Sequence, residues 1–356
     1  MQAIVWTGEL EVRDDVELRP IEPHEVLVRL HRAGLCHSDV AVIDGTIPFP
    51  TPVVLGHEGA GVVEEVGSAT SKVKVGDHVV LTTLGNCGQC DACDRGQPTH
   101  CRETMGRLGK PFTVGGAEAY QFANAGVFAD YTIVRESQAI VIDKAVPFDA
   151  ACLIGCAVVT GAGAVLNRAR VAPGQTVAVI GAGGIGLSVV QAARLAGASR
   201  IVVLDANPAK AAAALEFGAT DFVDASAVTD PIAAVKELGL KRGVDHAFEC
   251  VGHPALIRNA IDLLDWGGTC TLVGVPKLGT EASFVVNSLY NNKSILGCRY
   301  GATRPHHDIP LLVQLYLDGR FKLDEMVTKT YPLAEIGEAI ADLHDGKLNR
   351  GVLRIA

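Results

Sequence analysis

The sequence predicts an α/β protein in which a β-rich, loop-rich part is followed by a doubly wound parallel sheet. Short apolar runs such as EVLVRL and GDHVVLTT, separated by Gly, Pro and Asp turns, indicate strands up to about Cys156. Beyond Thr160 the pattern changes to strand, glycine-rich turn, helix and strand in QTVAVI, GAGGIG, LSVVQAARLAG and RIVVLDA. We therefore expect one domain to comprise 1–157 and 299–356, and the other to comprise 158–298.

Later segments continue this alternation of strands and helices. The runs DFVDA, HAFECVG, TCTLVGV and KSILGC predict further strands of a doubly wound parallel sheet. Three predicted helices each begin with proline, a favoured first helical residue. They run from Pro208 to Phe217, from Pro231 to Leu240 and from Pro254 to Leu264. The final run, RGVLRIA, predicts a strand that returns to the first domain.

Composition limits the classes of function. The chain has 356 residues, 48% of them hydrophobic, which is enough for two packed cores. Its net charge is −9 and no run is rich in Lys or Arg, which argues against nucleic-acid or acidic-membrane partners and favours small molecules. We expect no leader and no uninterrupted apolar span of membrane length, hence a cytoplasmic protein. Its ten cysteines are then expected to be thiols and metal ligands.

Four cysteines lie in one short segment, CGQCDACDRGQPTHC. Their spacing, C-x2-C-x2-C-x7-C, supplies a complete tetrahedral thiolate set and predicts structural zinc. A pair of disulfides is the alternative, but bridges between such close neighbours would be awkward and would constrain little chain. Because four sulfurs leave no open coordination position, this metal is expected to fold a loop. The ligands are Cys87, Cys90, Cys93 and Cys101.

A glycine-rich element follows the strand that ends at Ile180. GAGGIG matches G-x-G-x-x-G, opens a predicted helix, and is followed at the expected distance by Asp205 at the end of the next strand. This context predicts dinucleotide binding, with the pyrophosphate at the helix N-terminus. The carboxylate of Asp205 would accept from both ribose hydroxyls and repel a 2′-phosphate, which favours NAD. Lys210 either flanks the ribose or is a surface charge. The expected turn residues are Gly181, Gly183, Gly184, Ile185 and Gly186.

A second set of ligand-type residues lies in the β-rich part. Cys36, His57 and Cys156, in GLCHSD, GHEGAG and GCAVVTG, would form a three-ligand zinc site with an open fourth position, the set known from alcohol dehydrogenases. With the four-cysteine segment and GAGGIG, these motifs stand in an order that resembles the zinc-dependent medium-chain alcohol dehydrogenase family over essentially the whole chain. The resemblance implies a GroES-like catalytic domain and a Rossmann domain. Cys152 is not the expected ligand, because the family's cysteine directly follows the glycine at 155.

The resemblance also implies roles for the neighbours of these ligands. Asp39 would orient His57, and Glu58 would approach the metal from behind. Ser38 would take the proton of the alcohol and pass it toward the cofactor ribose. A histidine that completes this relay in many relatives is Ala41 here, so either water or His37 would carry the proton onward. The residues implied at the cofactor are His37 near the pyrophosphate, Thr160 beside the nicotinamide and Arg350 on a phosphate.

The implied reaction is a reversible transfer of hydride from a primary or secondary alcohol to NAD, with two zinc ions per chain. One alternative is a thiol-dependent formaldehyde dehydrogenase acting on S-hydroxymethyl adducts, with Arg102, Arg107 or Lys110 as the anchor for the thiol's carboxylates. A second is an alcohol:acceptor oxidoreductase that retains its NAD, and a third is a non-enzymatic nucleotide-binding protein. We expect exchangeable NAD and a homodimer or homotetramer.

A long segment, Arg102 to Asp130, follows the four-cysteine motif. Long structureless loops are usually functional, so this segment is expected to wall the substrate pocket with Thr83 and Leu84. Together with the C-terminal region it resembles the long-loop bacterial branch of the family, near the thiol-dependent formaldehyde dehydrogenases.

Overall fold

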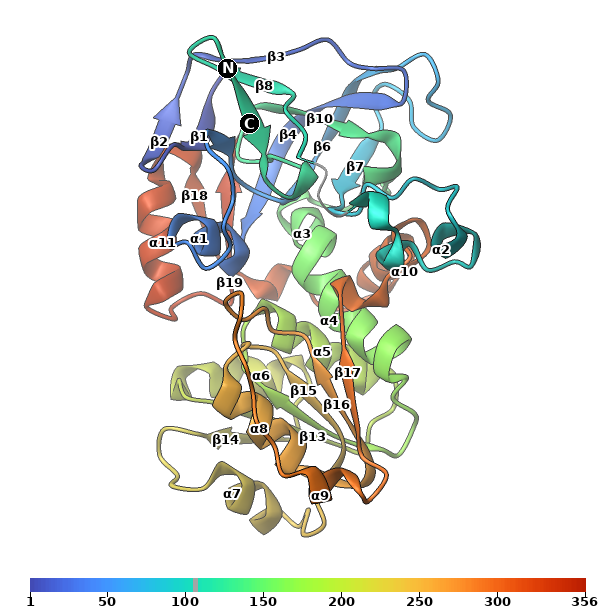
Figure 1. Cartoon of the computed structure of the whole chain (residues 1–356), viewed down its shortest axis with the longest axis vertical. Coiled ribbons are helices and arrows are strands. Elements are labelled where there is room, and N and C mark those ends of the chain that lie inside the picture. Colours follow the sequence, from blue (N-terminus) through green and yellow to red (C-terminus); the bar gives the residue numbers. More distant parts are fainter. Residues whose placement is uncertain (105–107) are drawn as a thin grey trace. The chain divides into compact units, whose positions relative to one another are not determined.

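The computed structural model describes residues 1–104 and 108–356 (Figure 1). Contacts divide the chain into two compact units, one of Met1–Cys156 with Arg304–Ala356 and the other of Ala157–Thr303. The predicted combination of a β-rich part and a parallel-sheet part is confirmed by three sheets, two in the first unit and one in the second. The chain returns to the first unit after Thr303, later than the expected residue 298.

The first unit contains a six-stranded sheet with the order β2-β1-β5-β9-β8-β3. Its buried face holds a small apolar cluster that includes Val5, Val54 and Phe112. The strands are β1 (Ala3–Trp6), β2 (Leu10–Arg13), β3 (Val16–Leu18), β5 (Val53–Val54), β8 (Phe112–Val114) and β9 (Ala117–Gln121).

A seven-stranded sheet of the same unit positions the metal-ligand motifs. Its order is β11-β7-β6-β4-β19-β18, and β10 also pairs with β4. The last strand of the chain, β19, runs antiparallel to β4, as RGVLRIA predicts. The strands are β4 (Glu25–Leu35), β6 (Glu58–Val66), β7 (His78–Leu81), β10 (Tyr131–Arg135), β11 (Ala139–Val141), β18 (Val327–Pro332) and β19 (Arg350–Arg354).

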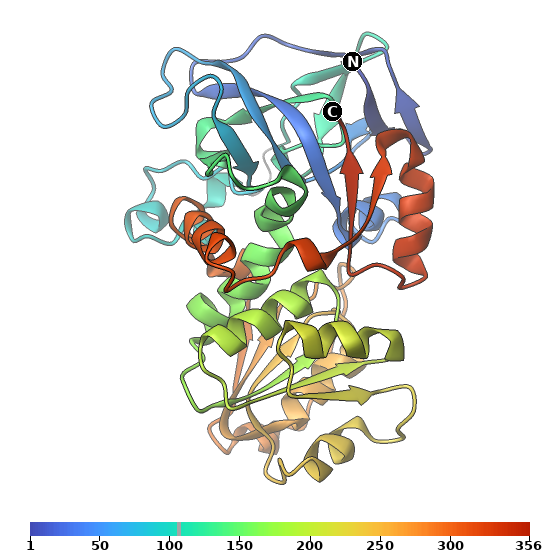
Figure 2. The ribbon, with the colours of Figure 1, turned by 180° about the vertical axis from the view of Figure 1, so that it is seen from behind.

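Helices of the first unit are mostly short. α11 lies against β18 and β19, and Figure 2 shows it beside these strands. It buries Ile336, Ala339 and Leu343 at helical spacing, as an amphipathic helix on a sheet does. The helices are α1 (His37–Ile43), α2 (Asp91–Asp94), α3 (Phe148–Leu153), α10 (Pro305–Leu317) and α11 (Ile336–His344).

The second unit is a parallel sheet of order β14-β13-β12-β15-β16-β17, with helices on both of its faces (Figures 1 and 2). Every strand pairing in it is parallel, as the βαβ pattern predicts. Its strands are β12 (Thr176–Ile180), β13 (Arg200–Asp205), β14 (Asp221–Asp224), β15 (Val244–Glu249), β16 (Leu264–Leu272) and β17 (Ser294–Gly297). Its principal helices are α5 (Gly184–Leu195), α6 (Ala211–Phe217), α7 (Pro231–Glu237) and α8 (Pro254–Asp262).

One helical run changes its winding twice. After α3, Ile154–Val158 is π-helical, Val159–Gly163 is the α-helix α4, and Ala164–Ala169 is again π-helical. This run is the one described helix with the length and apolar composition to cross a membrane, contrary to the expectation from the sequence. However, 83% of its apolar window is buried inside the folded chain, as in the core helix of a soluble protein.

The segment after the four cysteines is not a structureless loop, so that expectation is wrong. Its described part forms a hairpin of β8 and β9, joined by Gly115 and Gly116. Both glycines have positive φ, 57° and 81°, which suits a two-residue hairpin turn. Val114 pairs with Ala117 at the start of the ladder. Sequence analysis missed the hairpin because its strands are short.

Candidate active site and metal centres

The four-cysteine segment folds into a compact sulfur cluster. The sulfurs of Cys87, Cys90, Cys93 and Cys101 lie within 4.8 Å of one another. α2 forms one turn after Cys90, and the backbone N–H of Cys87 donates to the sulfur of Cys101 over 3.5 Å. All ten cysteines are free, so the alternative of two disulfides is not what the chain forms. Four convergent thiols fit a structural zinc ion.

Three separate elements bring a second set of ligands together. Cys36 follows β4 and caps α1, His57 directly precedes β6, and Cys156 lies in the first π-helical turn. Ligand atoms of these residues and of Glu58 lie within 4.8 Å of one another, and Cys36, His57 and Glu58 are buried. Two thiols and one imidazole fit a catalytic zinc ion that keeps an open position. Cys152 is absent from this group, as the sequence predicts.

The Cys156 turn packs very closely on β7. Gly155 has no side chain, and a Cβ there would overlap the backbone carbonyl oxygen of Leu81. A residue larger than glycine would therefore push the helix, and with it the Cys156 sulfur, away from the strand. Glycine is therefore required at position 155 by this close approach, which its place in the motif alone does not reveal.

Asp39 connects two of the metal-ligand motifs. It is 1% exposed, and its Oδ2 accepts from the backbone N–H of Cys36 over 3.1 Å. Its Oδ1 lies 2.9 Å from Nδ1 of His57 and 3.2 Å from the backbone nitrogen of Gly56, which donates to it. With Nδ1–H donating to this carboxylate, Nε2 of His57 is left available to a metal. The structure thus gives Asp39 the contacts that its expected role requires.

Glu58 and Arg350 form a buried ion pair beside this cluster. Glu58 is fully buried, and its Oε2 accepts from Nη2 of Arg350, which is 4% exposed. Burial raises the pKa of Glu58 to about 7, against the opposing effect of Arg350. Oε1 of Glu58 and Nε of Arg350 have no hydrogen-bond partner in the part of the chain that is described. Sequence analysis expected Arg350 to contact a phosphate, whereas here its guanidinium is directed at Glu58.

Ser38 lies next to the ligand set. Its Oγ is 3.8 Å from the sulfur of Cys36. His37 is exposed at the start of α1. Thr160 is 7% exposed in α4 of the other unit. The structure therefore places Ser38 near the Cys36 sulfur, and the cofactor contacts of His37 and Thr160 stay predictions.

An aromatic cluster packs against His57. The ring of Phe122 meets the imidazole edge-on, with centroids 5.4 Å apart, and Phe49 meets Phe122 in the same way at 5.4 Å. Tyr120 in turn lies 6.4 Å from Phe49. The backbone after Phe122 is unusual, because Ala123 and Asn124 both have positive φ. Sequence analysis missed this cluster, since its members are spread over two segments.

The glycine-rich turn of the second unit shows why glycine occurs at two of its positions. Gly181 has φ +96°, which favours glycine, and a Cβ at Gly186 would overlap the carbonyl oxygen of Gly181. A Cβ at Gly183 would meet nothing within 4 Å, so this side of the turn is open. α5 begins here with Gly184 and Ile185, and its free N–H groups suit a phosphate.

Asp205 ends β13, where the sequence places it. Its Oδ2 accepts from the backbone N–H of Ala182 over 2.6 Å, and its Oδ1 accepts from that of Asn207 over 2.8 Å. Lys210 is 8% exposed, so it is not the surface charge that one interpretation expected. Burial lowers the pKa of Lys210, while Asp205 opposes this effect. Both side chains are held at the same end of the sheet.

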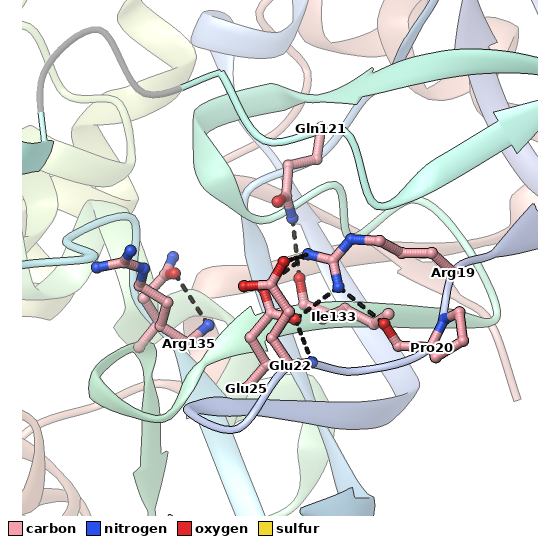
Figure 3. A network of polar contacts seen from close by, with 8 residues as sticks. Arg19, Pro20, Glu22, Glu25, Gln121, Ile133 and Arg135 are labelled. Atoms are coloured by element: carbon pink, nitrogen blue, oxygen red, sulfur yellow. Dashed lines mark hydrogen bonds and ion pairs between the residues drawn. The ribbon is translucent and has the colours of Figure 1, made fainter. Parts of the chain in front are cut away.

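The candidate anchors for an anionic substrate differ in their surroundings. Arg102 is exposed, and Lys110 lies 3.1 Å from Glu118 and over the ring of Tyr120. Arg107 lies outside the described residues. A cavity of about 340 Å³ adjoins this region, and Figure 3 shows the polar network on its wall, in which Arg19 pairs with Glu25. Because acids and bases are mixed on this wall, it has no clear preference for an anion.

Comparison with known proteins identifies the family. A model described as "Alcohol dehydrogenase GroES-like domain" matches residues 22–144, and one described as "Zinc-binding dehydrogenase" matches residues 184–318. The chain belongs to the zinc-dependent alcohol dehydrogenase family. An S-(hydroxymethyl)glutathione dehydrogenase from Photobacterium damsela subsp. piscicida is 39% identical to this dehydrogenase over 95% of either chain.

Solved structures agree with this membership. Benzyl alcohol dehydrogenase from Acinetobacter calcoaceticus is 36% identical, with a TM-score of 0.93 over 100% of this chain and 99% of that one. A zinc-binding dehydrogenase from Sinorhizobium meliloti 1021, solved bound to NADP, is 26% identical, with a TM-score of 0.84 over 99% of this chain and 98% of that one. The chain is thus an oxidoreductase of the zinc-binding dehydrogenases, near the formaldehyde dehydrogenases.

Proposed function

We propose that this dehydrogenase oxidises the S-hydroxymethyl adduct of a thiol with NAD. The observation that carries the proposal is the 39% identity over 95% of the chain to an S-(hydroxymethyl)glutathione dehydrogenase. The earlier alternative, thiol-dependent formaldehyde oxidation, is therefore preferred to ordinary alcohol oxidation. The reaction converts R–S–CH2OH and NAD⁺ into R–S–CHO, NADH and H⁺, so that the carbon loses a hydride and its hydroxyl loses a proton.

The proposed chemistry gives each residue around the Cys36, His57 and Cys156 set a role in the reaction. Cys36, His57 and Cys156 would hold zinc, and the zinc and NAD, when bound, supply a Lewis acid and a hydride acceptor. Oγ of Ser38, 3.8 Å from the Cys36 sulfur, would accept the hydroxyl proton of the substrate. Asp39 would keep His57 in the tautomer that leaves Nε2 unprotonated.

The turn at Gly181 to Gly186 is proposed to bind the pyrophosphate of NAD. The open side of Gly183 leaves room for a phosphate, and Asp205 places a carboxylate that disfavours a 2′-phosphate. Arg350, engaged by Glu58 here, would reach a phosphate only by leaving that partner. We propose that NAD exchanges between turnovers. Release of stoichiometric dinucleotide from denatured fresh protein, with no response to added NAD, would overturn this.

The substrate proposal is tested by following NADH formation with three substrates. These are formaldehyde with glutathione, formaldehyde alone and benzyl alcohol. We expect the highest kcat/KM for the adduct and little turnover of formaldehyde alone. Arg102→Ala should raise KM for the adduct and leave KM for benzyl alcohol unchanged, because only the adduct carries carboxylates. Equal rates with and without glutathione would refute the thiol adduct as the substrate.

A second candidate is the oxidation of an aromatic primary alcohol. It is favoured by the edge-on cluster of Phe122 and Phe49 beside His57 and by 36% identity to a benzyl alcohol dehydrogenase. Aromatic rings favour such edge-to-face contacts with one another. A kcat/KM for benzyl alcohol above that for the adduct, lowered by Phe49→Ala, would support this candidate.

We also propose that the enzyme is a homodimer or homotetramer in the cytoplasm, the compartment that its unpaired cysteines suit. The proposed association surface is supported by β17, which is an end strand of its sheet, and by the large apolar side chains that this unit exposes. Light scattering after chromatography should show that Tyr290→Ser with Leu278→Ser lowers the mass to that of a smaller oligomer. An unchanged mass would refute this surface. The exposed residues are Trp266, Val275, Leu278, Val285, Val286 and Tyr290.

A further inference from the structure

Three neighbouring strands carry the Glu58–Arg350 pair and a glycine between them. Glu58 begins β6, and in the antiparallel register its partner on β4 is Gly34. Arg350 begins β19, which pairs with β4 on the other side. The strand order β6-β4-β19 therefore places β4 between the acid and the base. The side chains must cross β4 to meet.

The crossing point is Gly34. A Cβ built on this residue would overlap Oε2 of Glu58 and would lie 3.2 Å from its carboxyl carbon. The backbone of Gly34 has no positive φ, so any residue could adopt its extended conformation. Glycine is thus required because a Cβ would collide with the Glu58 carboxylate, and not because of the backbone conformation at this position.

We propose that Gly34 is a positioning residue that keeps the Glu58 carboxylate on Arg350. The bare Cα of Gly34 leaves the passage through which Oε2 reaches the guanidinium. This inference rests on the proposed zinc-dependent function, because Glu58 is one of the four residues whose ligand atoms lie within 4.8 Å of one another. Its Oε1 has no hydrogen-bond partner among the described residues.

A side chain at position 34 would displace the Glu58 carboxylate from Arg350 and free it to bind the metal. Carboxylate oxygens are good zinc ligands, and the proposed site has an open fourth position. A carboxylate displaced from Arg350 has the Cys36, His57 and Cys156 cluster within reach, so it would compete with the substrate for the metal. Changes in residues that support metal ligands commonly alter metal affinity or activity by about 10- to 100-fold.

A double-mutant cycle separates this role from a general packing defect. Gly34→Ala, Glu58→Ala and the double variant are compared with Gly337→Ala, a glycine in α11 whose added Cβ would meet nothing within 4 Å. The measurements are the rate of zinc transfer to a chelator, the visible spectrum of the Co2+-substituted protein and kcat/KM. The first two need no substrate, so they decide the role of Gly34 even if the proposed substrate is wrong.

We expect Gly34→Ala to shift the Co2+ spectrum and to lower kcat/KM by about 10- to 100-fold. In the Glu58→Ala background the same change should have little effect, because no carboxylate remains to be displaced. Gly337→Ala should match the wild type. Two results would overturn the proposal. In one, Gly34→Ala has the Co2+ spectrum and kcat/KM of the wild type. In the other, Gly34→Ala lowers kcat/KM as much in the Glu58→Ala background as in the wild type. If Gly34→Ala does not fold, the double variant should; failure of both also overturns it.

Discussion

Replacing Asp39 with asparagine tests whether one carboxylate holds two metal-ligand motifs together. Asp39 accepts from the backbone nitrogens of Cys36 and Gly56 and from Nδ1 of His57. Asparagine has only one acceptor oxygen. If this oxygen accepts from His57 and Gly56, the side-chain NH2 group faces the buried N–H of Cys36, which is then left without an acceptor. An orphaned buried donor costs about 1–3 kcal/mol.

The two remaining hydrogen bonds also weaken, because the acceptor loses its charge. A bond to a charged group contributes about 1.5–3 kcal/mol and a neutral one about 1 kcal/mol. Together with the orphaned donor, the loss is roughly 2–7 kcal/mol, shared between folding stability and metal affinity. Since about 1.4 kcal/mol is a tenfold change, zinc affinity should fall by at least about tenfold.

The assay is zinc competition with a chelator, together with thermal unfolding. Asp230→Asn is the matched control, since this exposed carboxylate also accepts two backbone N–H groups, at the start of α7, where asparagine is an equally good cap. Asp39→Asn should lose zinc at lower chelator concentration and unfold at lower temperature, and the control should do neither. Wild-type zinc affinity in Asp39→Asn would refute the reasoning.

Four further predictions follow from the same geometry. Ser38→Ala should lower kcat by about 100- to 10,000-fold, and a near-wild-type rate would show that the proton leaves elsewhere. Asp205→Ala should raise kcat/KM with NADP relative to NAD, whereas an unchanged ratio would contradict our view of cofactor choice. Cys93→Ser should release one zinc per chain and lower Tm far more than it lowers kcat of the protein that stays folded. Burial, with Arg29 and Arg32, lowers the pKa of His31, so the folded chain resists protonation there and the free energy of unfolding should fall as pH drops below about 6.5. His31→Gln should flatten that slope in urea titrations, and an unchanged slope would exclude His31.

The spacing of residues within one short segment was enough to predict the sulfur cluster and the glycine-rich turn. The four cysteines lie close together in the sequence, so their spacing alone predicts the cluster that they form, and the glycine-rich turn between β12 and α5 follows from its own conformational needs. Cys36, His57 and Cys156 were found because each lies in a motif with a recognisable neighbourhood. Their convergence could not be derived from spacing, since it depends on how β4, β6 and the helix after α3 pack.

Other features depend on strand register, which the sequence did not reveal. That Gly34 lies opposite Glu58, and that Arg350 lies one strand beyond, follows from pairings between segments far apart in the chain. Arg350 was therefore assigned to a phosphate and its ion pair was missed. The positive φ values of Ala123 and Asn124 were equally hidden, because neither residue is glycine.

The position of the Cys156 sulfur in the metal site depends on the π-helical turn in which this residue lies. A π-helical turn amounts to one residue inserted into an α-helix, in which each residue rotates by about 100°. Deleting one residue at Ile154–Val158 would restore α-helical winding and redirect the side chains within this turn, while the side chains beyond it would keep their direction. The apolar helix would survive, while the sulfur would leave its two partners. A single deletion would thus separate the scaffold from its chemistry, giving evolution a short route from a metal enzyme to a metal-free protein of the same architecture.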